Sequence, residues 1–147
     1  MTNTPYRVRR LIPLIITMTL CFGCATRAAP RYSISVDNIM VLRGLSGKKI
    51  NLGNFTANRP GVNEFICRAA GPITTPDSEP FEDFIRKAFL DELRIADVYS
   101  PTASTALTGN LNEIGFSSLL SEWDVSLTVA SSNGKTLTVV EKYEAPP

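Results

Sequence analysis

The sequence predicts an α+β fold, in which a single amphipathic helix packs on one face of a mostly antiparallel sheet of about four to six strands. Three observations support this fold class. Apolar residues recur at three- and four-residue spacing over residues 81–97, as in a helix with one buried face. Two alternating segments, residues 122–130 and 135–143, flank an Asn-Gly pair that is typical of a hairpin turn. Shorter stretches with strand-like alternation precede the helix.

Three segments before the helix are predicted to be strands. Residues 33–42 alternate between apolar and other side chains, with Asn38 as the one polar break; the apolar positions are Ile34, Val36, Met40 and Leu42. Residues 50–57 form a weaker strand, in which Gly53 indicates a bulge or a close approach of another backbone. Residues 62–68 are the third candidate. The prolines within residues 69–79 predict a loop after it.

The predicted helix has clear start signals. Pro80 suits the first helical position, and Ser78 or Asp77 could cap the free backbone N–H groups. Acidic side chains favour the positive end of the helix dipole, and three stand here: Glu79, Glu82 and Asp83. The apolar stripe consists of Phe81, Phe84, Ile85, Ala88, Phe89, Leu93 and Ala96.

Residues 105–116 predict a strand with a bulge, and the hairpin follows it. A two-residue Asn-Gly loop would scatter the apolar side chains of the hairpin, whereas a three-residue loop with Gly134 in the left-handed conformation collects them on one face. The second register is therefore expected, with Trp123 opposite Tyr143, Leu127 opposite Val139 and Val129 opposite Leu137. Glu141, opposite Val125, is the one charge on that face, and the other face is mostly polar.

The first 23 residues have the pattern of a signal peptide. Residues 1–10 carry three arginines and no acidic residue. The apolar run over residues 11–22 is too short to cross a bilayer and suits the apolar region of a signal. It ends in Gly23-Cys24, which resembles the lipobox of bacterial lipoproteins, although Cys21 and Phe22 depart from the usual residues.

The lipobox resemblance implies cleavage between Gly23 and Cys24 and acylation of Cys24, which attaches the protein to a membrane. Residues 24–32 are then a lipid-anchored tether and residues 33–147 a single domain. The alternative is an ordinary secretory signal, cleaved after Ala25 or Ala28. By resemblance to lipoproteins of diderm bacteria, Ala25 after the acylated cysteine implies the outer membrane, facing the periplasm.

Charge and residue types exclude several classes of function. The formal net charge is +1, and three arginines lie in the predicted signal, so the remaining chain has a slight acidic excess. We therefore expect no nucleic-acid partner, since such partners require clustered Lys and Arg. The chain has no His, which is the commonest general base and a frequent metal ligand. We accordingly expect no enzymatic activity, no metal and no cofactor.

Two side chains, those of Cys67 and Glu92, are candidates for a chemical role. Cys67 stands beside Arg68, which could lower the thiol pKa, but a half-buried structural cysteine is the simpler interpretation. Glu92 falls within the apolar stripe of the helix, so it either reaches water at the edge of the stripe or pairs with a partly buried Arg. The three glycines Gly44, Gly47 and Gly53 match no phosphate-loop spacing.

Short motifs across residues 33–143 resemble a group of small envelope lipoproteins, which includes the YajG-like lipoproteins and the lipopolysaccharide-assembly lipoprotein. The residues that carry the resemblance are Gly53-Asn54-Phe55 with Asn58 and Arg59, the helix from Phe81 to Leu93, and Leu107-Thr108-Gly109-Asn110-Leu111. The resemblance implies the same order of strands, helix and hairpin.

Taken together, these observations lead us to expect a lipid-anchored accessory or assembly factor that acts by protein–protein interaction, with an envelope protein partner or as a homodimer. The alternative is a carrier or sensor that binds a lipid, glycan or peptide, and a cavity between helix and sheet would favour it. Relatives of this plan commonly continue into a second helix, whereas this chain stops at Pro147. If no helix covers it, part of the sheet should expose an apolar patch.

Overall fold

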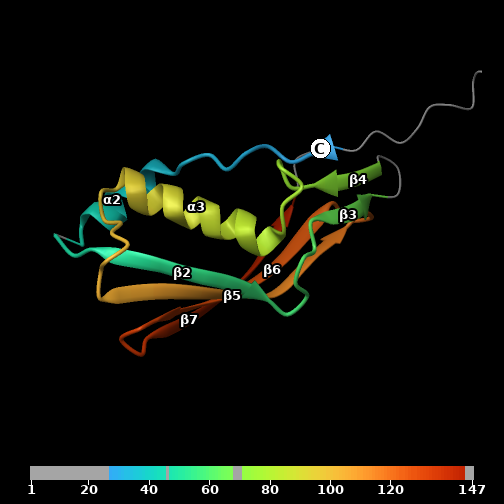
Figure 1. Cartoon of the computed structure of the whole chain (residues 1–147). Helices are drawn as coiled ribbons and strands as arrows, with labels where there is room; N and C mark the ends of the chain where they lie inside the picture. The colour runs from blue at the N-terminus through green and yellow to red at the C-terminus, as the bar shows by residue number, and fades with distance from the viewer. Residues whose placement is uncertain (1–26, 46, 68–70, 145–147) are drawn as a thin grey trace, which may run out of the picture.

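The structure, a computed structural model, describes residues 27–45, 47–67 and 71–144. The predicted signal peptide, the cleavage site at Gly23 and the acylation site at Cys24 lie outside these residues. Within them the chain forms a mixed α+β fold with two helices and two sheets (Figure 1). The α+β class is confirmed, whereas the expectation of one helix and one sheet was wrong.

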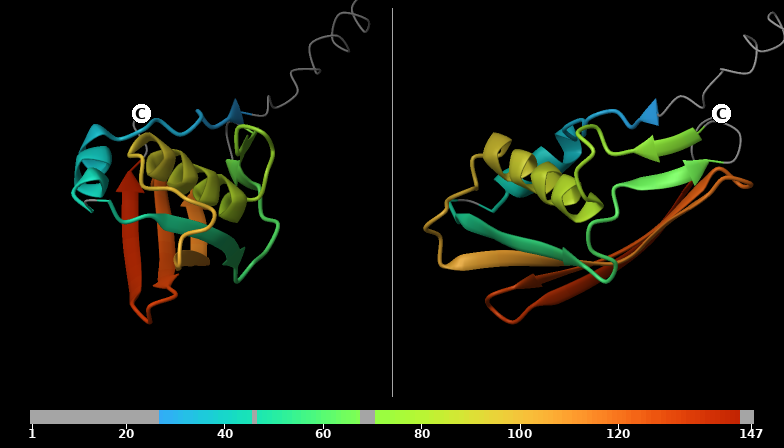
Figure 2. Two further views of the ribbon diagram at one scale, coloured as in Figure 1. Left: turned by 60° about the vertical axis from the view of Figure 1, so that its left-hand side comes forward. Right: turned by 45° about the vertical axis from the view of Figure 1, so that its right-hand side comes forward.

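The main sheet carries the helices on one side (Figure 2). Its strands, in spatial order, are β2 (Ile50–Ala57), β5 (Thr105–Ser117), β6 (Glu122–Ser131) and β7 (Thr136–Glu144). The pair β2–β5 is parallel and the other two pairs are antiparallel. The small sheet contains, in order, β1 (Arg27–Ala28), β4 (Gly71–Thr74) and β3 (Glu64–Cys67). The helices are α2 (Val36–Arg43) and α3 (Phe81–Ile95).

The predicted strand at residues 33–42 is wrong, because most of this segment forms α2. Ser35 caps the helix, with its side-chain oxygen accepting a hydrogen bond from the Asn38 backbone N–H at 3.4 Å. Asp37 in the first turn and Arg43 in the last turn suit the helix dipole. Only Ile39 is buried, and several apolar side chains face solvent: Val36, Met40 and Val41. The spacing of apolar residues led to a wrong prediction because these side chains are exposed on a helix and do not form the buried face of a strand.

The loop predicted over residues 69–79 is also wrong in part, because Gly71–Thr74 forms β4. This short strand pairs with β3 on one side, for example Phe65 with Ile73, and with β1 on the other. β3 lies just before it in the chain, but β1 lies far earlier, so the local sequence around Pro72 did not reveal the pairing on that side.

The predicted amphipathic helix is confirmed as α3, but its start differs in detail. Pro80 is the capping residue rather than the first helical residue, and no side chain caps the helix. Asp77 instead accepts hydrogen bonds from Arg31. Glu82 is buried, and its Oε1 accepts a hydrogen bond from the Gly61 backbone N–H at 2.9 Å. No helix in the three described ranges is long and apolar enough to span a membrane.

The predicted hairpin register is confirmed in every pair. Trp123 lies opposite Tyr143, Leu127 opposite Val139, Val129 opposite Leu137 and Val125 opposite Glu141. Gly134 has φ of +86°, which a glycine adopts without strain. The register places the apolar side chains of β6 toward the helices, where Trp123, Val125 and Leu127 join the core.

Bulges in β2 and β5 shape the centre of the sheet. The register of β2 shifts between Leu52 and Phe55, which confirms the irregularity predicted at Gly53. Gly53 lies within this shift and has no register partner in β5, and its carbonyl accepts a hydrogen bond from Arg86 Nε of α3 at 2.8 Å. In β5 the shift lies between Leu111 and Glu113, as expected for a bulged strand. α3 is therefore tied to the sheet at the bulge.

The described part of the segment predicted as a tether contacts the domain. β1 pairs with β4, and the Ala29 N–H donates to the Thr74 carbonyl at 2.8 Å. Arg31 forms a bidentate pair with Asp77, at 2.7 and 3.0 Å. Residues 27–32 thus pack along the domain, and only residues 24–26 of the predicted tether lie outside the described chain.

Candidate functional site

An apolar groove of about 740 Å³ lies between the two helices and the main sheet. It is lined mainly by α3, α2 and the strands beneath them. The lining side chains are Tyr32, Asn38, Val41, Leu42, Ile50, Phe84, Ile85, Ala88, Phe89, Glu92, Leu93, Leu107 and Leu137. Ligand pockets typically have volumes of about 300–1,000 Å³ and mostly apolar walls with a few polar groups, so the groove has the size and character of a binding site.

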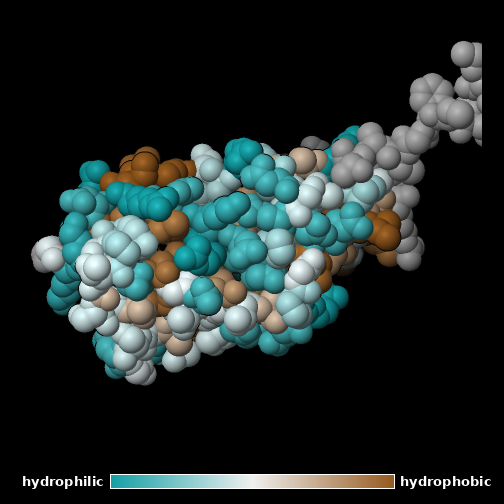
Figure 3. Space-filling view, viewed as in Figure 1, coloured by the Kyte–Doolittle hydropathy of each residue, from teal (hydrophilic) through white to brown (hydrophobic). Residues whose placement is uncertain are grey.

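The mouth of the groove lies between α2 and β7. Val41 of α2 and Leu137 of β7 line it and are largely exposed, Leu137 to 65%. Figure 3 shows the apolar surface that gathers over α2. The exposed apolar side chains of α2 are Val36, Met40 and Val41, and Val41 also lines the groove.

The inner face of β7 is uncovered. β7 packs only beside β6 among the described elements, and α3 packs on β2 and β5. Leu137, Val139 and Tyr143 share the face that looks toward the groove, and all three are exposed. The exposed apolar patch expected on the sheet is therefore present along β7.

Glu92 is the charged group inside the groove. It is only 6% exposed, and its Oε1 accepts hydrogen bonds from the Tyr32 hydroxyl, the Ser35 backbone N–H at 3.0 Å and Asn38 Nδ2 at 3.4 Å. Its other oxygen, Oε2, is buried and has no hydrogen-bond donor among the described residues. Neither expectation for Glu92 was right: it is buried rather than reaching water at the edge of the stripe, and it pairs with no Arg among the described residues.

Through Oε1, Glu92 holds α2 and the preceding segment against α3. Burial raises the pKa of Glu92, but the hydrogen bonds from Tyr32, Ser35 and Asn38 outweigh it, and the pKa lies below the ordinary value of 4.5. Burial and the contact with Glu92 raise the pKa of Tyr32 above its ordinary 10.0. At neutral pH the groove therefore contains a carboxylate beside an un-ionised phenol.

The lowered pKa predicts an acid-sensitive contribution of Glu92 to stability. Because the pKa is lower in the folded than in the unfolded chain, the contribution is fully present above about pH 4.5 and is lost as the pH falls through the folded-state pKa. We expect Glu92→Gln to destabilise the protein at pH 7 and the difference from wild type to shrink below pH 4.5. Urea unfolding across this range measures it, and a difference that grows on acidification would contradict the prediction.

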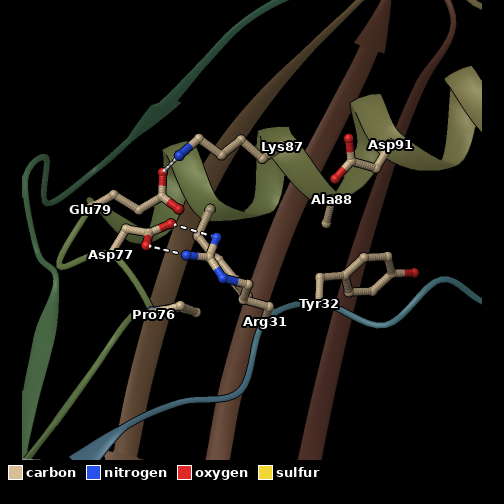
Figure 4. Close-up of a pocket in the computed structure, with 9 residues that line it drawn as sticks. Arg31, Tyr32, Pro76, Asp77, Glu79, Lys87, Ala88 and Asp91 are labelled. Carbon is tan, nitrogen blue, oxygen red and sulfur yellow. Dashed lines mark hydrogen bonds and ion pairs between the residues drawn. The ribbon is translucent and has the colours of Figure 1, made fainter.

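A smaller polar cavity of about 180 Å³ adjoins the groove and shares Tyr32, Phe84 and Ala88 with it (Figure 4). Two ion pairs cross it: Arg31 with Asp77, and Lys87 with Glu79. Contact with Glu79 raises the pKa of Lys87 above its ordinary 10.5. These paired charges satisfy one another and leave little free bonding capacity for a ligand in this cavity.

The structure brings few of the other candidate residues together. Cys67 ends β3, is half-buried and forms no disulfide among the residues described. Acidic side chains at the start of α3 contact Gly61 and Lys87 rather than each other. The described residues contain no cluster of side chains that could hold a metal ion.

Two polar residues of the groove, Tyr32 and Asn38, were missed by the sequence analysis. Tyr32 was assigned to the tether and Asn38 to a strand, so neither was expected near the helix. The available signal was Glu92 itself, because a carboxylate within an apolar stripe requires donors from another part of the chain.

Comparison with models of known protein families, with curated proteins and with solved structures finds no match to this chain.

Proposed function

We propose that the protein is a lipid-anchored envelope protein that holds an apolar or amphiphilic ligand in the groove between its helices and its sheet, as a carrier or sensor. Attachment is through acylated Cys24, at the outer membrane facing the periplasm. The observation that carries the proposal is the groove of about 740 Å³ with largely apolar walls. A carrier needs such a cavity between helix and sheet to hold its ligand, whereas an adaptor does not.

The position of the groove suits an apolar ligand. Core side chains such as Phe89 and Leu93 form its floor, and exposed apolar side chains on α2 and β7 surround its mouth. A ligand in the groove would remove both sets of side chains from water, which contributes about 25 cal/mol per Å² of apolar surface. A lipid tail meets this requirement better than a glycan, which needs many polar contacts.

Binding of N-phenyl-1-naphthylamine, an uncharged apolar fluorophore, to the purified full chain in detergent-free buffer tests the proposal. We expect saturable binding that Leu137→Asp weakens about tenfold, because the change removes apolar contact and places a charge at the groove mouth. Val140→Asp is the matched control. Val140 is 71% exposed on the same strand but faces away from the groove, opposite Ser126.

Equal affinities for wild type and both variants would place the fluorophore outside the groove and would contradict the proposal. Absence of any saturable binding would do the same. Circular dichroism and melting temperature of the two variants check that each retains its fold.

The adaptor function remains a second candidate because of β7. This strand is exposed along its whole length, and one of its edges is unpaired in the described sheet. Such an edge can pair with a strand of another chain. Chemical crosslinking in intact cells, followed by mass spectrometry, would favour the adaptor if one envelope protein, or a second copy of this chain, is captured in fixed proportion through β7.

A further inference from the structure

The carboxylate of Glu92 is not neutralised within the described chain. Its three hydrogen-bond donors, from Tyr32, Ser35 and Asn38, are all uncharged. No Lys or Arg forms an ion pair with it among the residues described. The three donors keep Glu92 ionised, so its negative charge remains in the groove, and a buried oxygen without a donor is unfavourable. Oε2 is such an oxygen.

Charged side chains around Tyr32 add to the negative charge. The groove and the adjoining cavity together are lined by four acidic and two basic side chains: Asp77, Glu79, Asp91 and Glu92, with Arg31 and Lys87. Each basic side chain is engaged by one carboxylate, Arg31 by Asp77 and Lys87 by Glu79 (Figure 4). Asp91 and Glu92 are left as the excess, so the polar end of the groove is anionic.

Aromatic rings stand beside this anionic end. Tyr32 and Phe84 line both the groove and the cavity, and Phe89 lines the groove. The faces of aromatic rings attract cations, by about 0.5–2 kcal/mol according to how far the cation is desolvated. The same end of the groove therefore offers a carboxylate and aromatic rings, and both favour a positively charged group over a negative one.

We propose that the groove selects amphiphiles with a primary ammonium head group, which lies beside the carboxylate of Glu92 while the apolar tail lies between α3 and the sheet. The inference rests on the proposed function, since it requires that the groove holds a ligand. Fatty acids and other carboxylate amphiphiles are disfavoured, because their head groups would lie beside Glu92 with the same charge and no donor.

Competition among three amphiphiles of one tail length tests the proposal. Dodecylamine, dodecanol and dodecanoate, each below its micelle concentration, displace N-phenyl-1-naphthylamine from the full chain at neutral pH. We expect dodecylamine to displace the fluorophore at a concentration at least about tenfold lower than dodecanoate, with dodecanol between them, because only the ammonium forms a charge-assisted hydrogen bond.

Glu92→Gln is the decisive variant, because the amide keeps the size and one accepting oxygen for Ser35 and Asn38 but removes the charge. We expect the advantage of dodecylamine over dodecanoate to fall to within about threefold. Asp83→Asn is the matched control. It removes one negative charge from an exposed position in the first turn of α3 that does not line the groove, so the advantage should persist.

The outcomes separate the two proposals. If none of the three amphiphiles displaces the fluorophore, the head-group inference fails, whereas the carrier function is decided by the binding of the fluorophore itself and its weakening by Leu137→Asp. If dodecanoate competes as well as dodecylamine with wild type, or if Glu92→Gln keeps the wild-type order, the head-group inference is overturned while the carrier function stands. Should Glu92→Gln fail to fold, the wild-type order of the three amphiphiles still decides the inference.

Discussion

Replacing Leu111 by alanine is expected to lower the free energy of unfolding by about 2–5 kcal/mol, because it removes a buried side chain and leaves a cavity. Leu111 is 3% exposed and belongs to the buried cluster with Phe81 and Ile114, against which Trp123 packs. Urea unfolding of wild type and variant measures the difference.

Leu120→Ala is the matched control for this prediction. Leu120 lies in the turn between β5 and β6 and is 66% exposed. The same side-chain truncation should change the unfolding free energy by no more than about 0.5 kcal/mol there. Equal effects at the two positions would mean that Leu111 does not lie in the core as described.

Gly109→Ala is expected to destabilise the protein by about 1–3 kcal/mol through overpacking. A Cβ atom on Gly109 would lie 2.5 Å from two carbon atoms of the Phe55 ring. The ring cannot move away freely, because Phe55 is buried and packs against Phe89 with 5.4 Å between ring centroids. The glycine in β5 therefore provides the space in which an aromatic ring of β2 lies. Thermal and urea unfolding measure the loss.

Gly115→Ala provides the control within the same strand. Gly115 also lies in β5, but a Cβ atom there would meet nothing within 4 Å. Its φ is not in the left-handed region, so alanine should be neutral or slightly stabilising by reducing the freedom of the unfolded chain. If both substitutions were neutral, the ring of Phe55 could not lie against Gly109.

The parts of the fold that the sequence predicted are those in which neighbouring residues decide the outcome. The hairpin register followed from the alternation of Trp123, Leu127 and Val129 and from a loop that places Gly134 in a left-handed conformation, all within residues 122–143. α3 followed from an apolar stripe within one helix. In both cases the apolar residues that form the contacts recur at a regular spacing, which can be read directly from the sequence.

The parts that the sequence mispredicted depend wholly or partly on partners far along the chain. β4 pairs with residues 64–67 just before it, but also with residues 27–28, which lie far earlier in the chain. α2 forms because Ser35 caps it and Glu92, 57 residues away, accepts the Ser35 N–H. The capping serine and Asp37 were visible in the sequence, but the alternation of apolar residues over 33–42 outweighed them in the prediction.

The candidate site, too, was predictable from the sequence only in part. Glu92 could be singled out from the sequence, because a carboxylate in an apolar stripe is unfavourable unless other groups satisfy it. Its partners could not, since Tyr32 and Asn38 reach it only when the segment before α2 packs along α3. The groove itself leaves no sequence signal, because its walls come from two helices and three strands and any of these residues could equally belong to a closed core.

The sequence by itself determined the α+β class, the amphipathic helix, the bulged strand and the register of the hairpin, and it predicts the lipid attachment at Cys24. Only the tertiary structure decided the second helix, the small sheet, the partners of Glu92 and the presence of a groove. The physical reason is that the spacing of apolar residues and the residues at turns indicate which face of each helix or strand is buried. The space left between segments depends on how side chains from distant segments fit together.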